Sequence, residues 1–177
     1  MGLFSKLFGK KDDFSYIAEI SSLISENNPD VMEKINLCIG HPAPYSVQNA
    51  ERYGERGIED VYDADNAEIC WIGMVDELAE NGYLFSADYK SEPEDILWGL
   101  SQLKSYHLIE KYVPDIDLTK IEDAEALAQE INLAVSGAFV CMIDIDSDSY
   151  ELIIVTHEVY EKISVIAENN GHSIEIF

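Results

Sequence analysis

Positive charge is scarce in this sequence. Eleven lysine and arginine residues stand against 35 aspartate and glutamate residues, which gives a formal net charge of −24. A surface this acidic repels phosphate backbones, so the composition argues against nucleic-acid binding through a basic footprint. The acids do not mark a disordered chain, because 47% of the residues are hydrophobic and 10% are aromatic. The composition therefore indicates a folded acidic protein.

Long hydrophobic runs and cysteines are also scarce. No stretch approaches the roughly 18 consecutive apolar residues of a membrane-spanning helix, and the first residues lack the apolar run of a secretory signal. Cys38, Cys70 and Cys141 lie far apart in apolar stretches, which is typical of reduced thiols in a protein core. We therefore expect a cytoplasmic protein.

Phosphate-binding and calcium-binding motifs are incomplete or absent. None of the ten glycines forms GxGxxG or GxxxxGK[ST]. Asp144, Asp146 and Asp148 have the opening spacing of an EF-hand loop. That loop needs glycine at its sixth position and an acid at its twelfth, where this chain has Ser149 and Val155. The pattern favours an acidic hairpin tip, with weak divalent-cation binding at millimolar levels as the alternative.

The histidines and cysteines form no complete zinc motif. His157-Glu158 begins like HExxH, but Glu161 stands where the second histidine is required. Cys38 and His41 have the spacing of a ligand pair, with no second pair to complete four ligands. We expect no metal and no cofactor. Counting leaves a Cys–His nucleophile pair open, although the apolar surroundings of the cysteines favour inert thiols.

The eleven N-terminal residues differ from the rest in charge. They contain Lys6, Lys10 and Lys11 and no acid, so residues 12–177 hold 8 basic and 35 acidic residues, a net charge of −27. In a helix, four apolar residues of this segment would share one face: Leu3, Phe4, Leu7 and Phe8. We expect the segment to dock on the acidic domain, with membrane contact as the less favoured alternative.

Hydrophobic spacing predicts an α+β fold in which residues 12–177 form a single domain behind the basic segment 1–11. Four β-rich runs predict a mainly antiparallel sheet, with strands near residues 83–89, 138–145, 150–156 and 172–177. The central strands are apolar on both faces, as strands covered by helices are. We expect several covering helices, segregated to one face or one end of the sheet.

Helix signals place these covering helices. Helical spacing predicts helices following Asp13 and Asn28, and over 66–81 and 157–169. Two capping boxes predict two more helix starts: Ser91 with Glu94, and Thr119 with Glu122. For residues 45–65, which include Arg52 and Arg56, we expect a short helix followed by a loop.

One segment has a recognisable pattern. Five residues form W-x-G-x-x-D-E-L: Trp71, Gly73, Asp76, Glu77 and Leu78. Gly82-Tyr83-Leu84, Asp88-x-Lys90 and Trp98 follow it. With this pattern, residues 66–177 resemble a family of uncharacterised bacterial domains of unknown function. The resemblance implies a small bacterial cytosolic protein and assigns no activity. Glycine at position 73 would also let a neighbouring element approach its helix closely.

The acidic charge favours a non-catalytic module that binds a basic protein, as immunity proteins that neutralise cationic toxins do. Six candidate partner-binding acids lie on a solvated helix face and at the hairpin tip: Asp76, Glu77, Glu80, Asp144, Asp146 and Asp148. One alternative is a small enzyme with a site assembled from dispersed residues, such as Asp88, Lys90, His107 and Asp144. Another is an acidic housekeeping protein without a specific basic partner.

Overall fold

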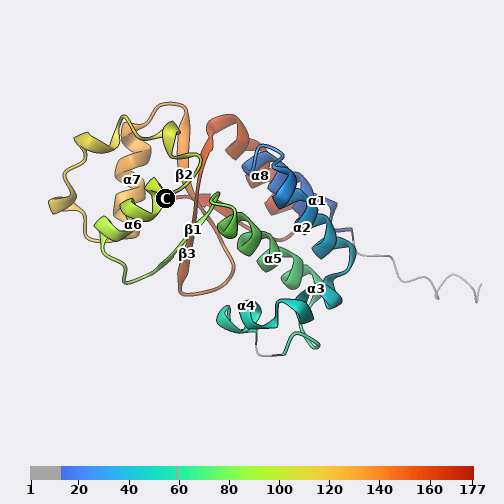
Figure 1. Cartoon of the computed structure of the whole chain (residues 1–177). Helices are drawn as coiled ribbons and strands as arrows, with labels where there is room; N and C mark the ends of the chain where they lie inside the picture. Colours follow the sequence, from blue (N-terminus) through green and yellow to red (C-terminus); the bar gives the residue numbers. More distant parts are fainter. Residues whose placement is uncertain (1–12, 59) are drawn as a thin grey trace, which may run out of the picture.

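A computed structural model describes residues 13–58 and 60–177 (Figure 1). Five helices come first: α1 (Ser15–Ile24), α2 (Pro29–Gly40), α3 (Pro42–Gln48), α4 (Ala50–Glu55) and α5 (Asn66–Glu80). Strand β1 (Phe85–Asp88), helix α6 (Pro93–Ser101), three 3-10 turns (Tyr106–Leu108, Val113–Asp115 and Leu118–Lys120) and helix α7 (Ala124–Ala134) follow. The chain continues with β2 (Ala138–Ile143), β3 (Ser149–Thr156), α8 (His157–Asn169) and β4 (Ile174–Ile176). The predicted α+β class is confirmed.

The strands form one antiparallel sheet in the order β1-β3-β2-β4. In the β2–β3 hairpin Cys141 pairs with Ile153, and on the other side of β2 it pairs with Ile176 of β4. Strand β1 pairs with β3, so that Phe85 lies opposite Leu152. All four predicted strands are confirmed in place, each within a few residues of its expected ends.

Helices cover both faces of this sheet, with α1, α2, α5 and α8 on one side and α6 and α7 on the other (Figure 1). The side chains of β3 alternate between two hydrophobic cores. Ile153 and Val155 join the first core, while Leu152 and Ile154 join the second. The expectation that the helices are segregated to one face or one end of the sheet is therefore wrong, because strands that are apolar on both faces need apolar cover on both.

Helix starts follow the residues that supply hydrogen-bond acceptors. Asn28 caps α2, since its Oδ1 accepts from the backbone N–H of Asp30 at 3.1 Å. The two predicted capping boxes are wrong. Helix α6 starts at Pro93, which has no N–H to satisfy, without a side-chain cap. Helix α7 is capped by Asp123, whose Oδ1 accepts from Ala126 at 2.8 Å.

Residues 45–65 contain more helix than the sequence predicted. Helix α3 begins at Pro42 and α4 follows it, so the segment is mainly the end of α3, α4 and a loop. Tyr45 of α3 and Tyr53 of α4 are buried against α5. A Cβ atom on Gly73 would lie 2.9 Å from the Tyr53 hydroxyl and 2.9 Å from the Cys38 Sγ. The predicted close approach at Gly73 is confirmed.

The sequence also predicted that no helix spans a membrane and that residues 1–11 dock on the domain. Within 13–58 and 60–177, no helix combines the length and apolar character needed to cross a bilayer. The predicted docking of the basic segment 1–11 concerns residues outside those that the structure describes.

Candidate functional site

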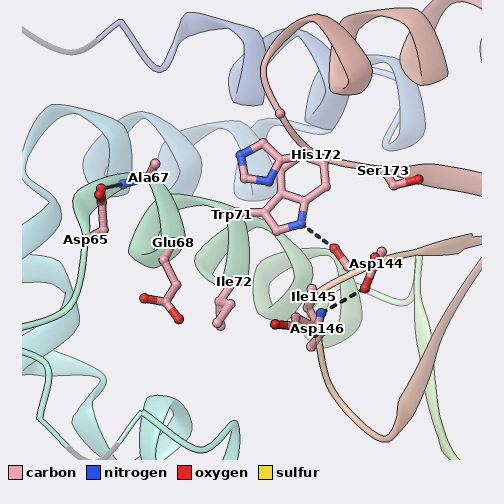
Figure 2. A pocket seen from close by; sticks show the side chains of 11 residues that line it. Asp65, Ala67, Glu68, Trp71, Ile72, Asp144, Ile145, Asp146, His172 and Ser173 are labelled. Carbon is pink, nitrogen blue, oxygen red and sulfur yellow. Dashed lines mark hydrogen bonds between the residues drawn. The ribbon is translucent and has the colours of Figure 1, made fainter.

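A pocket of about 530 Å³ lies between the start of α5, the β2–β3 hairpin and the turn from α8 to β4 (Figure 2). Four carboxylates line it: Asp65, Glu68, Asp144 and Asp146. Its apolar walls come from Trp71, Ile72 and Ile145. The described residues that line this pocket include no lysine or arginine. We call it the acidic pocket.

The back of the acidic pocket is a stacked pair of rings. Trp71 of α5 and His172 of the α8–β4 turn have centroids 4.0 Å apart and planes inclined by 9°. The indole Nε1 of Trp71 donates to the backbone carbonyl of Asp144 at 2.8 Å, which ties α5 to the hairpin. Tyr16 of α1 is joined to Nε2 of His172 at 2.9 Å. One histidine thus connects α1 and α5 at the pocket wall.

The surroundings shift the ionisation of both polar rings at this wall. Burial lowers the pKa of His172 below its usual 6.5, so the imidazole is neutral at pH 7. Burial raises the pKa of Tyr16 to about 12, so its hydroxyl remains protonated. Because neither ring is positively charged and the described lining includes no lysine or arginine, no cation within the pocket balances its carboxylates.

Local turns place the acids of the pocket. Asp65 is the N-cap of α5, and its Oδ1 accepts from Ala67 at 2.8 Å. Asp144 Oδ1 accepts from the backbone N–H of Asp146 at 2.8 Å, while Asp146 itself has a left-handed φ of 56°. Glu68 and Asp146 are exposed, and Figure 2 shows Ile72 between them in the view. Their carboxylates are available to a ligand.

The hairpin acids also border a second hollow. Asp144 and Asp148 line a pocket of about 400 Å³ together with Tyr89, Met142 and Tyr150. Across 13–58 and 60–177, no three His, Cys, Asp or Glu side chains are grouped so that they could hold a metal ion. The hairpin carboxylates therefore form a continuous acidic edge between two hollows, without a cation cage.

A buried ion-pair cluster lies elsewhere, where α4 meets α5 and β3. We define it by Arg52, Arg56, Asp76, Glu77 and Glu151. Arg52 Nη1 lies 3.0 Å from Glu77, and Arg56 Nη2 lies 3.1 Å from Asp76. Arg56 also pairs with Glu151, which has no exposed surface. Three carboxylates thus share two guanidinium groups, so the cluster has a formal charge of −1.

Asp76 and Glu77 were expected on a solvated helix face, and this is wrong. They are 7% and 2% exposed, because α3 and α4 cover the side of α5 that the sequence suggested was free. Glu80 does keep an exposed side chain, at 61%. Burial raises the pKa of Asp76, although Arg56 and Arg52 act in the opposite direction. Tyr45 donates to Glu77 Oε1 at 2.5 Å.

The cluster is a structural element of the fold. A buried carboxylate is costly unless it is paired and hydrogen-bonded, and each acid of the cluster has such partners. Glu151, for example, accepts from Ser149 at 2.7 Å and also from Ser86. Arg52 of α4 and Arg56, the residue that follows this helix, therefore hold α4 against α5 and β3.

The residues suggested for an enzyme site do not gather into one. Asp88 Oδ1 accepts from the backbone N–H of Lys90 at 2.8 Å, which is a local turn contact two residues apart. His107 Nδ1 lies 3.0 Å from the Lys104 carbonyl, and Asp144 Oδ1 accepts from the backbone N–H of Asp146, so the hydrogen bonds of these two side chains go to other residues. Asp144 alone lines the acidic pocket.

The cysteines also lack the character of nucleophiles. All three are free and fully buried. Burial raises the pKa of Cys141, and contact with Cys38 together with burial raises that of Cys70. These two thiols remain protonated at pH 7. The prediction of core thiols is confirmed.

Sequence reasoning missed Asp65, Glu68 and His172 as site residues. Asp65 and Glu68 carry a local signal, because an N-cap and a first-turn acid mark the start of α5. His172 has none, since its partners Tyr16 and Trp71 are distant in sequence.

The fold and the site together define an α+β domain that has helices on both faces of its sheet and an open acidic pocket. The chain belongs to the family described as domain of unknown function (DUF6630), which matches residues 17–177. The resemblance to a domain of unknown function is thus confirmed, and the match extends well beyond the 66–177 that the sequence pattern suggested. The chain matches no curated protein and no solved structure.

Proposed function

We propose that this domain is a non-catalytic module that binds a basic protein segment. The binding surface consists of five exposed carboxylates, which we call the acidic surface: Asp65, Glu68, Asp144, Asp146 and Asp148. The observation that carries the proposal is their placement around two hollows whose described lining residues include no lysine or arginine. Such a surface attracts cations and accelerates association with a basic partner.

The chemistry of the pocket walls fits lysine or arginine side chains of a partner. These side chains combine an apolar stem with a charged end. In the acidic pocket, Ile72 and Ile145 offer apolar contact, while Glu68 and Asp146 offer charge at the rim. Small inorganic cations would use the carboxylates and leave the apolar walls unused. The mixed walls therefore favour a peptide over a free ion.

The proposed surface differs from the one that the sequence suggested. Asp76 and Glu77 take no part, because they are buried and paired with arginines. Glu80 lies 3.7 Å from Arg52, so its charge is partly compensated. The proposed surface keeps Asp144, Asp146 and Asp148 and adds Asp65 and Glu68, because these five acids line the two hollows.

The proposal can be tested with a fluorescent peptide of alternating lysine and leucine. Its Kd for the full chain is measured by anisotropy at about 50 mM and about 300 mM salt, where the Debye length differs more than twofold. The double variant Glu68→Gln/Asp146→Asn removes two pocket charges. At about 0.5–1 kcal/mol per rim ion pair, it should weaken binding about 5- to 30-fold at low salt.

A matched control separates the pocket from the overall charge. Glu110→Gln/Glu122→Gln removes two exposed acids that do not line the acidic pocket, so its affinity should stay within about twofold of the wild type. Equal weakening in both double variants, or an affinity that does not change with salt, would refute the proposed surface.

A further inference from the structure

We infer that the acidic pocket is a docking site for the basic N-terminal segment, residues 1–11, of the same chain. This inference goes beyond the proposed partner binding and does not depend on it. It rests on where the described chain starts, on the charge of the pocket, and on the composition of the segment.

The described chain starts beside the pocket. Asp13 precedes α1 and accepts a hydrogen bond from the backbone N–H of Ser15 at 3.0 Å. Tyr16, in the first turn of α1, is joined at 2.9 Å to His172. His172 lines the acidic pocket. The N-terminal segment therefore joins the described chain close in sequence to Tyr16, whose side chain contacts the pocket wall.

The segment is long enough for this site. Eleven residues span about 36–40 Å when extended and about 16 Å as a helix. Either length is several times the rise of one helical turn, which is about the spacing along the chain between Asp13 and Tyr16. A short tether also gives an effective concentration in the millimolar range, so even a weak contact is occupied. The acidic pocket competes well for the segment against distant surfaces.

Charge complementarity selects the pocket. The segment holds Lys6, Lys10 and Lys11 and no acid, while residues 12–177 have a net charge of −27. Four carboxylates line the pocket, and its described lining includes no basic side chain. Lys10 and Lys11 come only two to three residues before Asp13, which places them nearest the attachment point.

The apolar residues of the segment also find a counterpart there. Leu3, Phe4, Leu7 and Phe8 alternate with the basic part of the segment. The pocket is lined by Ile72 and Ile145 together with the indole of Trp71, on whose other side His172 lies in the view (Figure 2). A purely acidic helix face would satisfy the lysines and leave the phenylalanines in water. The mixed walls of the acidic pocket satisfy both.

A spin-label experiment on the full chain tests the inference. Ser5→Cys introduces a thiol for a nitroxide label, and the three native cysteines are buried and protected. Paramagnetic broadening is then read on backbone amides of ¹⁵N-labelled protein at about 50 mM salt. We expect broadening at Glu68, Asp146 and Ser173. Reversing the segment charges with Lys6→Glu/Lys10→Glu/Lys11→Glu should remove it.

A matched triple variant controls for net charge. Lys34→Glu/Lys90→Glu/Lys111→Glu changes the same number of charges at exposed lysines of the domain, and it should leave the broadening in place. Broadening that survives the segment reversal, that is absent, or that lies elsewhere would overturn the inference. A second sample mixes two kinds of chain: one carries the spin label but no ¹⁵N, and the other carries ¹⁵N but no spin label. Equal broadening in this mixture would show that the contact forms between molecules, and it would also overturn the inference.

A membrane is the competing occupant for the segment. Vesicles containing phosphatidylserine serve as the probe. Vesicle binding by the wild-type chain, combined with no broadening at the pocket before vesicles are added, would assign the segment to the membrane and overturn the inference. The peptide titration tests the proposed function, and the spin-label experiment tests the docking of the segment. Either proposal can therefore be refuted while the other stands.

Discussion

The indole of Trp71 and the imidazole of His172 are stacked 4.0 Å apart, with their planes only 9° from parallel. Tyr16 extends this contact to α1 through its hydrogen bond to the imidazole. Three segments that are distant in the sequence therefore meet at one side chain, which is also a wall of the acidic pocket. Protonation of His172 should therefore change the stability of the whole domain.

The stability of the domain should fall on mild acidification because of His172. Burial lowers its pKa below 6.5 in the folded state, so the unfolded chain binds a proton at pH values where the folded chain does not. The contribution of neutral His172 to the free energy of unfolding is thus complete above about pH 6.5, and it is lost as the pH falls below that value. Urea unfolding at about pH 7.5 and about pH 5.5 measures the difference.

His172→Gln should reduce this fall in the free energy of unfolding. The matched control is His107→Gln, because His107 is exposed and should leave the pH dependence unchanged. If the wild type and His172→Gln lose the same free energy between the two pH values, the stacked imidazole is not the titrating group.

Removing Arg56 should destabilise the fold strongly. Arg56→Met leaves Glu151, which has no exposed surface, without its guanidinium partner, and also takes one partner from Asp76. An unpaired buried charge costs about 3–5 kcal/mol. Chemical denaturation measures the loss. Adding Glu151→Gln to Arg56→Met should recover part of it, because the unpaired charge is then gone.

Glu80→Gln is the control for this cluster. Glu80 is 61% exposed and lies 3.7 Å from Arg52, so its loss should change the stability by less than about 1 kcal/mol. A change as large as that of Arg56→Met would show that burial does not decide the strength of these pairs.

Gly99 should resist substitution where Gly54 tolerates it. A Cβ atom on Gly99 of α6 would overlap the ring of Phe85 on β1, so Gly99→Ala should cost about 1–3 kcal/mol. Gly54 of α4 has no other side chain near its Cβ position, and Gly54→Ala should stabilise the helix by up to about 1 kcal/mol. Thermal melts of both variants compare them; a stabilised Gly99→Ala would contradict the packing.

The helix caps can be tested in the same way. Asn28→Ala removes the acceptor for Asp30 at the start of α2 and should cost about 0.5–2 kcal/mol. Ser91→Ala should change the stability by less than about 0.5 kcal/mol, because α6 has no side-chain cap at its start. A larger loss for Ser91→Ala would mean that the predicted capping box forms after all.

The local patterns of the sequence predicted the elements well where the signal lies within a few residues. Strands near 138–145 and 150–156 and the helix over 66–81 are confirmed, since apolar periodicity and turn residues act locally. The same reasoning failed for Ser91 and Thr119. Competing signals, a proline at the first helical position and Asp123 closer to α7, set those starts instead.

The candidate site was predicted in part. The hairpin acids Asp144, Asp146 and Asp148 lie at its edge, as their turn-forming spacing suggested. Asp76 and Glu77 looked like neighbours of Glu80 on one acidic face. Their burial depends on Arg52 and Arg56, in and just after α4, which are 20 or more residues away in the sequence, and no helical periodicity can reveal this.

The sequence by itself determined the acidic charge, the strands and helices, and the basic character of residues 1–11, because composition and short-range spacing fix these properties. Only the tertiary structure decided which acids are free. Folding buried Asp76, Glu77 and Glu151 with two arginines, and it gathered Asp65, Glu68 and the hairpin acids around an open pocket. A carboxylate is charged in either place, but its partners come from distant parts of the chain, and they decide whether it stabilises the fold or faces a ligand.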